Sequence, residues 1–130
     1  MPRGGRRNGD APGQYPPLLV GDSDSGSRRV FRLLFERLGF RVLEAAAGEE
    51  ALALAEAHLP CVVIAESTLP RDDNFQAYVR AHRIPCIATV TNEQGTVPPQ
   101  AVAVLEKPFA LSELQREVFR VLRHPMVRAT

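Results

Sequence analysis

The chain has 130 residues and a hydrophobic content of 45%, which corresponds to about one ordinary domain with enough apolar material for a core. Sixteen basic and fifteen acidic residues give a formal net charge of +1, so bulk charge gives no reason to expect a nucleic-acid or membrane-surface binder. No apolar stretch approaches the length of a transmembrane span, and a cytoplasmic protein is expected.

The beginning of the chain differs in composition from the rest. Residues 1–17 contain four glycines, four prolines and almost no large apolar side chains, which predicts a flexible N-terminal tail. One domain is expected over residues 18–124, followed by a short C-terminal tail at 125–130.

The first half of this domain alternates between strand and helix patterns. A short buried strand is predicted at 18–20, a second strand at 40–45, and a helix from Gly48 that ends before Pro60. The helix between the two strands is predicted from an apolar stripe that stops at Gly39. Its stripe consists of Val30, Phe31, Leu34, Phe35 and Leu38, and the core face of the next helix consists of Leu52, Ala55 and Leu59.

The second half continues the alternation with one interruption. The run at 61–65 has no polar alternation, which is typical of a strand covered on both faces of a parallel sheet. A short helix is predicted at 74–83, strands at 84–90 and 101–105, and a loop at 91–100, where glycine and two prolines disfavour a helix.

A final helix is predicted over residues 111–124, with a capping box formed by Ser112 and Gln115. Its core face consists of Leu114, Val118, Val121 and Leu122. Alternating strands and helices predict an α/β fold, in which a doubly wound, five-stranded parallel sheet carries helices on both faces. The fourth helix of this alternation is expected to be shortened or absent.

Polar residues follow several of the predicted strands, at the edge where chemistry occurs in open α/β sheets. Acidic side chains after the first and third strands would face Lys107, the only lysine in the chain, after the fifth. Such a cluster suits a hard cation together with a phosphoryl group. The residues at these strand ends are Asp22, Ser23, Asp24, Glu66, Val90, Thr91 and Lys107.

Three segments together resemble the receiver domain of two-component response regulators. They are "LLVGDSDSGSRRVFRLLFERLGF", "ESTLP" and "LEKPF", and the resemblance covers about residues 18–124. It implies a flavodoxin-like sheet with strand order 2-1-3-4-5. It also implies a phosphoryl-accepting aspartate at position 66, Mg²⁺ held with an acidic pair at positions 22 and 23, and a lysine at 107.

The sequence departs from this pattern at four positions. Asp22 and Lys107 match it, whereas Ser23 and Glu66 stand where the family has acidic and aspartate residues. At the two switch positions, Val90 replaces a hydroxyl residue and Val104 replaces an aromatic one. Thr89 and Thr91 flank Val90, but a shift of one residue turns a side chain to the opposite face of a strand.

The substitutions at positions 23 and 66 weaken the expected chemistry. Glu66 is one methylene longer than aspartate, and a displacement of about 1 Å costs on the order of a hundredfold in rate. Ser23 removes a charged oxygen, so Mg²⁺ held by Asp22, Asp24 and Glu66 is expected to bind weakly or not at all, and no other cofactor is expected. Asp24 could equally cap the first helix. Glu66 could pair with Lys107, either in imitation of a modified aspartate or as a plain structural ion pair.

The preferred interpretation is an atypical, non-enzymatic receiver domain in signal transduction that acts without phosphorylation as a protein-interaction module. Its partner, or a second copy, would bind through the last helix and the 91–100 loop, with no role for nucleic acid or membrane. The candidate contact residues on that helix are Arg116, Glu117 and Arg120.

Two alternatives remain open. One is a conventional receiver in a phosphorelay, with Asp22 or Asp24 as the substitute acceptor. The other is a small aspartate-based phosphohydrolase with Asp22 as nucleophile and Asp24 as acid/base, which lacks the late acidic pair that such enzymes need.

Overall fold

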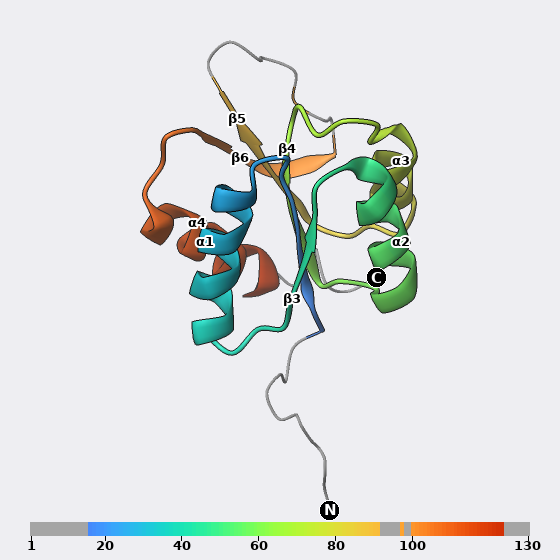
Figure 1. The fold of residues 1–130 in the computed structure, drawn as a ribbon. Coiled ribbons are helices and arrows are strands. Elements are labelled where there is room, and N and C mark those ends of the chain that lie inside the picture. Colours follow the sequence, from blue (N-terminus) through green and yellow to red (C-terminus); the bar gives the residue numbers. More distant parts are fainter. Residues whose placement is uncertain (1–15, 92–96, 98–99, 124–130) are drawn as a thin grey trace, which may run out of the picture.

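The computed structural model describes residues 16–91, 97 and 100–123, which form one sheet with helices on both sides (Figure 1). The sheet has five parallel strands in the order β3-β2-β4-β5-β6, which confirms the predicted order 2-1-3-4-5. Helices α1 and α4 cover one face, and α2 and α3 cover the other (Figure 1). The elements are β2 (Leu18–Gly21), α1 (Ser25–Arg37), β3 (Val42–Ala45), α2 (Gly48–His58), β4 (Val62–Glu66), α3 (Asp73–Ala81), β5 (Cys86–Val90), β6 (Ala101–Glu106) and α4 (Leu111–Arg123).

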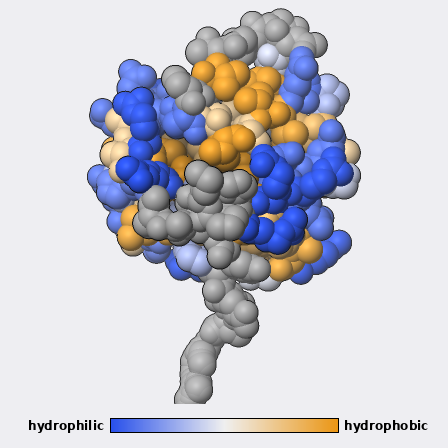
Figure 2. Space-filling model, turned by 180° about the vertical axis from the view of Figure 1, so that it is seen from behind, coloured by the Kyte–Doolittle hydropathy of each residue, from blue (hydrophilic) through white to orange (hydrophobic). Residues whose placement is uncertain are grey.

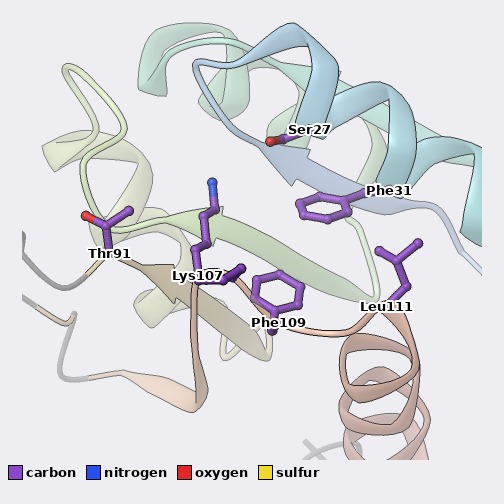
Figure 3. A pocket seen from close by; sticks show the side chains of 7 residues that line it. Ser27, Phe31, Thr91, Lys107, Phe109 and Leu111 are labelled. Carbon is purple, nitrogen blue, oxygen red and sulfur yellow. The ribbon is translucent and has the colours of Figure 1, made fainter.

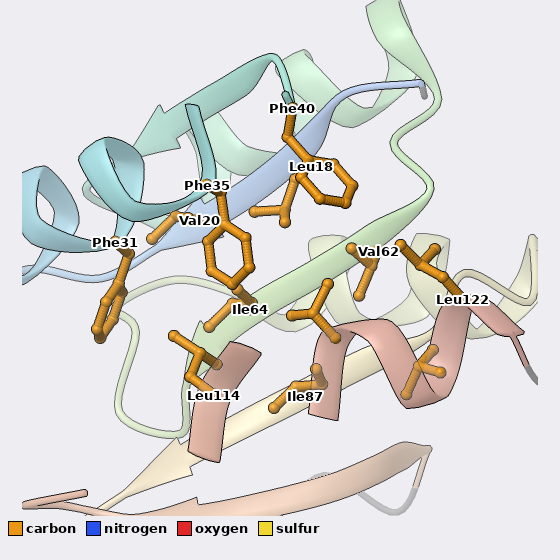
Figure 4. Packing of buried hydrophobic residues seen from close by; sticks show 12 residues of the cluster. Leu18, Val20, Phe31, Phe35, Phe40, Val62, Ile64, Ile87, Leu114 and Leu122 are labelled. Carbon is orange, nitrogen blue, oxygen red and sulfur yellow. The ribbon is translucent and has the colours of Figure 1, made fainter. Parts of the chain in front are cut away.

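The central strands supply two hydrophobic clusters, one on each side of the sheet. Along β4, Val62 and Ile64 face α1 and α4, whereas Val63 and Ala65 face α2 and α3, because successive side chains of a strand point to opposite faces. Figure 4 shows the first cluster, in which Phe35 lies close to β2 and β4. All four of these β4 residues are buried, as predicted for a strand covered on both faces.

Helix α1 begins at Asp24, whose side chain caps it, and packs mainly through Phe31 and Phe35. Leu34 and Leu38 are partly buried beside them. The prediction that Val30 belongs to the core stripe is wrong, since its side chain is 45% exposed. Val30 lies at the edge of the apolar stripe farthest from Phe35, and a helix buries only the sector that faces the sheet.

Helix α2 buries a different set of residues from the predicted one. Ala55 is buried as expected, but Ala51 and Gly48 are its buried neighbours, while Leu52 is only partly buried. A Cβ atom on Gly48 would lie 2.1 Å from the carbonyl oxygen of Arg71, so small residues let this helix approach the loop after β4. The packing of α2 therefore depends on small side chains rather than on a leucine stripe.

Leu59 is the other correction on this helix. It follows the last residue of α2 in a left-handed conformation (φ 47°), and it is 57% exposed. That backbone conformation ends the helical repeat, so the periodicity that placed Leu59 on the core face no longer applies.

Helix α4 has the predicted core face, since Leu114, Val118, Val121 and Leu122 are all buried. The predicted capping box at Ser112 and Gln115 is wrong. The carboxylate of Glu113 accepts a 2.9 Å hydrogen bond from the backbone N–H of Ala110, so the capping pair lies two residues earlier than predicted. Several other elements end one or two residues away from their predicted ends.

Strand β6 lies at one edge of the sheet, and its residues alternate between partly buried and exposed. Ala103 and Leu105 pack against the cluster under α4, whereas Val102 and Val104 point to the other face and are exposed. The predicted loop at 91–100 lies outside the described residues, except for Thr91, Val97 and Gln100.

The predicted tails at 1–17 and 125–130 also lie outside the described residues, apart from Pro16 and Pro17. Pro17 is buried, and its carbonyl oxygen accepts a 2.9 Å hydrogen bond from the N–H of Cys61. Within the described residues, none of the helices has the length and apolar character that crossing a membrane requires.

Candidate functional site

The charged residues predicted at the strand ends meet at one place. In the sheet, Gly21 pairs with Ala65, so the next residues on the two strands, Asp22 and Glu66, are neighbours. Lys107 directly follows β6, and its N–H donates a 2.7 Å hydrogen bond to the carbonyl oxygen of Val90. The fold therefore brings together Asp22, Glu66 and Lys107 from three separate parts of the chain.

Asp22 is almost completely buried, at 1% exposure, and both of its carboxylate oxygens have partners. Oδ2 accepts a 2.9 Å hydrogen bond from Nζ of Lys107, and Oδ1 accepts a 2.8 Å bond from the N–H of Asp24. Its backbone carbonyl accepts a 2.7 Å bond from the guanidinium of Arg28. Burial of a carboxylate is costly unless it is paired and hydrogen-bonded, and here an ammonium and an amide provide those partners.

Glu66 is turned towards the loop between β2 and α1. Its Oε1 accepts a 2.6 Å hydrogen bond from the N–H of Ser23, and its Oε2 lies 4.0 Å from Nζ of Lys107. The side chain is 12% exposed. The longer side chain thus reaches Lys107 only at the limit of an ion pair, and its closer partner is a backbone amide that composition and spacing do not reveal.

The three carboxylates proposed as magnesium ligands do not come together. The side chain of Asp24 caps α1, because its Oδ2 accepts 2.8 Å hydrogen bonds from both the N–H and the hydroxyl of Ser27. These bonds hold the pKa of Asp24 below its usual value. The oxygens of Asp22 and the Oε1 of Glu66 are also engaged. Among the described residues, no group of three or more histidines, cysteines, aspartates or glutamates could hold a metal ion.

The residues present therefore do not fit the predicted three-carboxylate site for Mg²⁺, and the alternative prediction of a helix cap accounts for Asp24. Weak binding of Mg²⁺ by Asp22, Asp24 and Glu66 stays a prediction from the sequence.

The side chains at the two predicted switch positions have no group that could bond a phosphoryl group. Val90 is half-buried at the end of β5, and Val104 is 46% exposed on β6. Thr89, which flanks the predicted switch position, pairs with Glu66 in the sheet, and paired residues in parallel strands point to the same face. Thr89 is 1% exposed, and no described residue bonds its hydroxyl. Counting the register of β4 against β5 would have located it.

A cavity of about 520 Å³ opens beside the charged cluster (Figure 3). Lys107 borders it together with two phenylalanine rings, Phe31 and Phe109, whose centroids lie 5.9 Å apart. These aromatic walls are not predictable from the spacing of residues, although Phe109 belongs to the "LEKPF" segment. The cavity is lined by Ser27, Phe31, Thr91, Lys107, Pro108, Phe109 and Leu111.

The two cysteines take no part in this cluster. Burial raises the pKa of Cys61 to about 11 and that of Cys86 to about 12. Both thiols are protonated at neutral pH and are free in the structure. They act as small apolar side chains, which agrees with their position at the start of apolar runs.

Comparisons with known proteins show which proteins this chain is similar to. No family model matches the chain. The chain is 27% identical over 118 residues to the probable transcriptional regulator ycf27 of Porphyridium aerugineum, covering 85% of this chain and 49% of that protein. It is 30% identical over 106 residues to the transcriptional regulatory protein PdtaR of Mycobacterium tuberculosis, covering 75% of this chain and 52% of that protein. The chain thus spans about half the length of the curated relatives it matches.

Two solved structures have a fold similar to that of this chain. A putative response regulator from Chloroflexus aurantiacus is 26% identical with a TM-score of 0.74, covering 85% of this chain and all (100%) of that one. A CheY-like receiver domain from Methanospirillum hungatei has the same fold at 15% identity, with a TM-score of 0.73 over 88% of this chain and 98% of that one. With this fold, strand order and these relatives, the chain is a response-regulator receiver domain, the kind of domain used in two-component signalling.

Proposed function

We propose that this receiver domain works as a protein-interaction module without phosphoryl transfer. The observation that carries the proposal is the state of Glu66, which accepts a 2.6 Å hydrogen bond from Ser23 and lies 4.0 Å from Lys107. A glutamate at the acceptor position that is bonded within the domain acts as a fixed negative charge. Glu66 carries this charge without a phosphoryl donor.

The charges around Lys107 support the same function. Its ammonium already faces the carboxylates of Asp22 and Glu66 at 2.9 and 4.0 Å. A phosphorylated aspartate would bring a charge of roughly −1.5 to −2, whereas Glu66 supplies about −1. The lysine therefore has a permanent, weaker substitute for the charge that phosphorylation would create.

The switch positions support it further. Val90 has no hydroxyl to contact a phosphoryl group, and Val104 is an exposed β-branched residue that cannot undergo an aromatic rearrangement. The domain departs from the family pattern at positions 23, 66, 90 and 104. It would therefore have no residue to accept a phosphoryl group or to respond to one. What remains for function is the surface.

The interaction surface includes α4 in this proposal. Arg116 and Arg120 are exposed on that helix, while Glu117 is half-buried and accepts a 2.6 Å hydrogen bond from Arg120. Participation of the 91–100 loop, the absence of nucleic acid and membrane from the partners, and a cytoplasmic location stay predictions from the sequence.

The test is intact mass spectrometry after incubation with Mg²⁺ and acetyl phosphate, with rapid trapping of labile adducts. We expect no added phosphoryl group on the wild type. The variant Glu66→Asp tests whether the remaining site can transfer a phosphoryl group once an aspartate is restored, and Glu66→Gln is its matched control.

A phosphoryl group on the wild type would overturn the proposal. If Glu66→Gln gained it as well, the acceptor would be another residue, with Asp22 and Asp24 as the first to map. If only the wild type gained it, the acceptor would be Glu66 itself, and the domain would be a conventional receiver with an unusual acceptor.

A further inference from the structure

The cavity beside the charged cluster has the size and the lining of a small-molecule site. Its volume is about 520 Å³, and such sites typically measure about 300–1,000 Å³. In Figure 3 the rings of Phe31 and Phe109 and the side chain of Leu111 lie towards one side of it, and Lys107 and Thr91 lie towards the other. An apolar wall that faces a few polar groups is the usual arrangement for binding a small organic molecule.

The apolar wall offers a surface for one more ring but no slot between its own rings. Phe31 and Phe109 are stacked, with centroids 5.9 Å apart and planes at 21°. A ring inserted between them would need about 7 Å, since carbon atoms in contact are about 3.5 Å apart. Phe31 is also buried, whereas Leu111 is 39% exposed. A flat molecule would therefore pack beside the stacked pair, against Phe109 and Leu111.

Lys107 is the hydrogen-bond donor of the polar wall. Its ammonium has three N–H groups, and its hydrogen-bond partner among the described residues is Oδ2 of Asp22, at 2.9 Å. Oε2 of Glu66, at 4.0 Å, is too distant for a hydrogen bond. Since Lys107 borders the cavity, an oxygen atom of a ligand placed there would accept a hydrogen bond from it.

The charges next to the cavity disfavour a charged ligand of either sign. Lys107 faces the carboxylates of Asp22 and Glu66, so these three groups together carry an excess of negative charge. An anion that approached the lysine would also approach both carboxylates. A cation would meet the ammonium itself. An uncharged molecule avoids both kinds of repulsion.

We propose that this cavity binds an uncharged aromatic molecule that bears a carbonyl oxygen. Its ring packs against Phe109 and Leu111, and its carbonyl oxygen accepts a hydrogen bond from Lys107. The inference goes beyond the proposed function, because it assigns a small-molecule ligand to the domain and requires neither a particular result with acetyl phosphate nor a partner bound to α4.

The first experiment is a ¹H–¹⁵N NMR titration of the whole 130-residue chain with acetophenone, which has one phenyl ring and one carbonyl group. We expect saturable shifts at the amides of Thr91, Lys107, Phe109 and Leu111. The dissociation constant should be about 1–10 mM, as is usual for so small a ligand. The absence of a saturable shift at these amides, up to the solubility limit of acetophenone, overturns the inference.

The same titration contains a control for adhesion of the probe to apolar surface in general. Figure 2 shows that apolar residues are also exposed on the side of the molecule opposite to the view of Figure 1. Val102 and Val104 of β6 are 42% and 46% exposed and do not line the cavity. Their amides should shift little, and shifts as large as those at the cavity would contradict a specific site.

The second experiment tests the charge of the ligand. Benzoate and benzylammonium have the same ring as acetophenone but carry a negative and a positive charge. Each should bind at least about fivefold more weakly, because two like charges about 4 Å apart in water cost roughly that factor in affinity. Tighter binding of benzoate would indicate an anion site, and tighter binding of benzylammonium a cation site. Either result contradicts an uncharged ligand.

The third experiment tests the aromatic wall. Phe109→Leu keeps this position apolar but removes the ring, so it should weaken acetophenone binding about two- to tenfold through loss of ring stacking. Phe119→Leu on α4 is the matched control, because Phe119 is also partly buried against the same cluster and does not line the cavity. It should leave the dissociation constant unchanged. Equal weakening by both variants would contradict stacking on Phe109.

The fourth experiment tests the donor, with toluene as a probe that has the ring and no oxygen. Lys107→Met should weaken acetophenone binding about tenfold, because a hydrogen bond from a charged group is lost. It should leave toluene binding unchanged. If Lys107→Met does not fold, Asp22→Asn/Lys107→Met replaces it, since that variant also removes the carboxylate that the lysine neutralises. Equal effects on the two probes would contradict the hydrogen bond from Lys107.

Discussion

Lys107 bonds the buried carboxylate of Asp22 at 2.9 Å across 85 positions of sequence, and this contact holds the loop after β6 to the loop after β2. Asp22 is 1% exposed, whereas the lysine side chain is 24% exposed. The two side chains therefore differ in their access to water. Loss of the lysine would leave a carboxylate that water can scarcely reach.

Replacement of this lysine gives the first prediction. Lys107→Met should lower the free energy of unfolding by about 2 kcal/mol, less than the ~3–5 kcal/mol of a fully buried pair because Lys107 is partly exposed. Urea denaturation measures the change. The double variant Asp22→Asn/Lys107→Met removes the charge of Asp22 together with that of its partner, so its loss should be smaller than the sum of the two single losses. Strictly additive losses would show that the pair is not coupled.

Asp24 gives a prediction about acid stability. Its pKa is lowered in the folded state by the hydrogen bonds from Ser27, so its stabilising effect is complete above the unfolded pKa of 3.8 and is lost as pH falls through the lower, folded value. Asp24→Ala should therefore be less stable than wild type at neutral pH, and this difference should shrink below pH 3.8. Urea midpoints at several pH values measure it, with Asp24→Asn as a control that keeps a neutral cap. A difference that grows in acid would contradict the cap.

Gly48 gives a prediction about backbone packing. In Gly48→Ala the new Cβ would lie 2.1 Å from the carbonyl oxygen of Arg71, so the backbone must shift, at a cost of about 1–3 kcal/mol. Gly26→Ala on α1 is the matched control, because its Cβ would meet only the Asp24 side chain at 3.4 Å. That change should be neutral or stabilising by up to about 1 kcal/mol. Equal urea midpoints for the two variants would show that the loop after β4 moves freely.

Thr89 gives a prediction of increased stability. Its buried hydroxyl has no partner among the described residues, and an unpaired buried polar group costs about 1–3 kcal/mol. The isosteric change Thr89→Val should therefore raise the free energy of unfolding by about 1 kcal/mol, whereas Thr91→Val, at an exposed position, should change it little. A loss of stability in Thr89→Val would mean that the hydroxyl is bonded, through water or to Glu66.

The fold could be predicted from the sequence because strand patterns and helix patterns alternate regularly along the chain. Apolar runs such as 61–65 show no polar alternation, and a parallel sheet covered on both faces follows from them. Asp22 and Lys107 were found in the same way, since residues after parallel strands meet at one edge of the sheet. Relations of this kind depend on topology, which the pattern of elements determines.

The nearest partner of Glu66 and the core face of α2 could not be predicted from the sequence, because they depend on backbone groups and on close packing. The nearest partner of Glu66 is the N–H of Ser23, and every residue except proline has such a donor, so no residue type signals it. The core face of α2 was misplaced because Gly48 and Ala51 pack more closely than leucines could, and periodicity carries no information on that distance. An aspartate at position 24 suits both a metal ligand and a helix cap, and only the hydrogen bond from Ser27 distinguishes the two roles.

The position of Lys107 directly after an edge strand links two properties of the domain. Edge strands are the parts of a sheet that open most readily, because neighbours hold them on one side only. When β6 separates from β5, the hydrogen bond from the N–H of Lys107 to the carbonyl oxygen of Val90 breaks, and the ammonium leaves Asp22 and Glu66 behind. Hydrogen exchange at the Lys107 amide would therefore report how often the two carboxylates lose their cation.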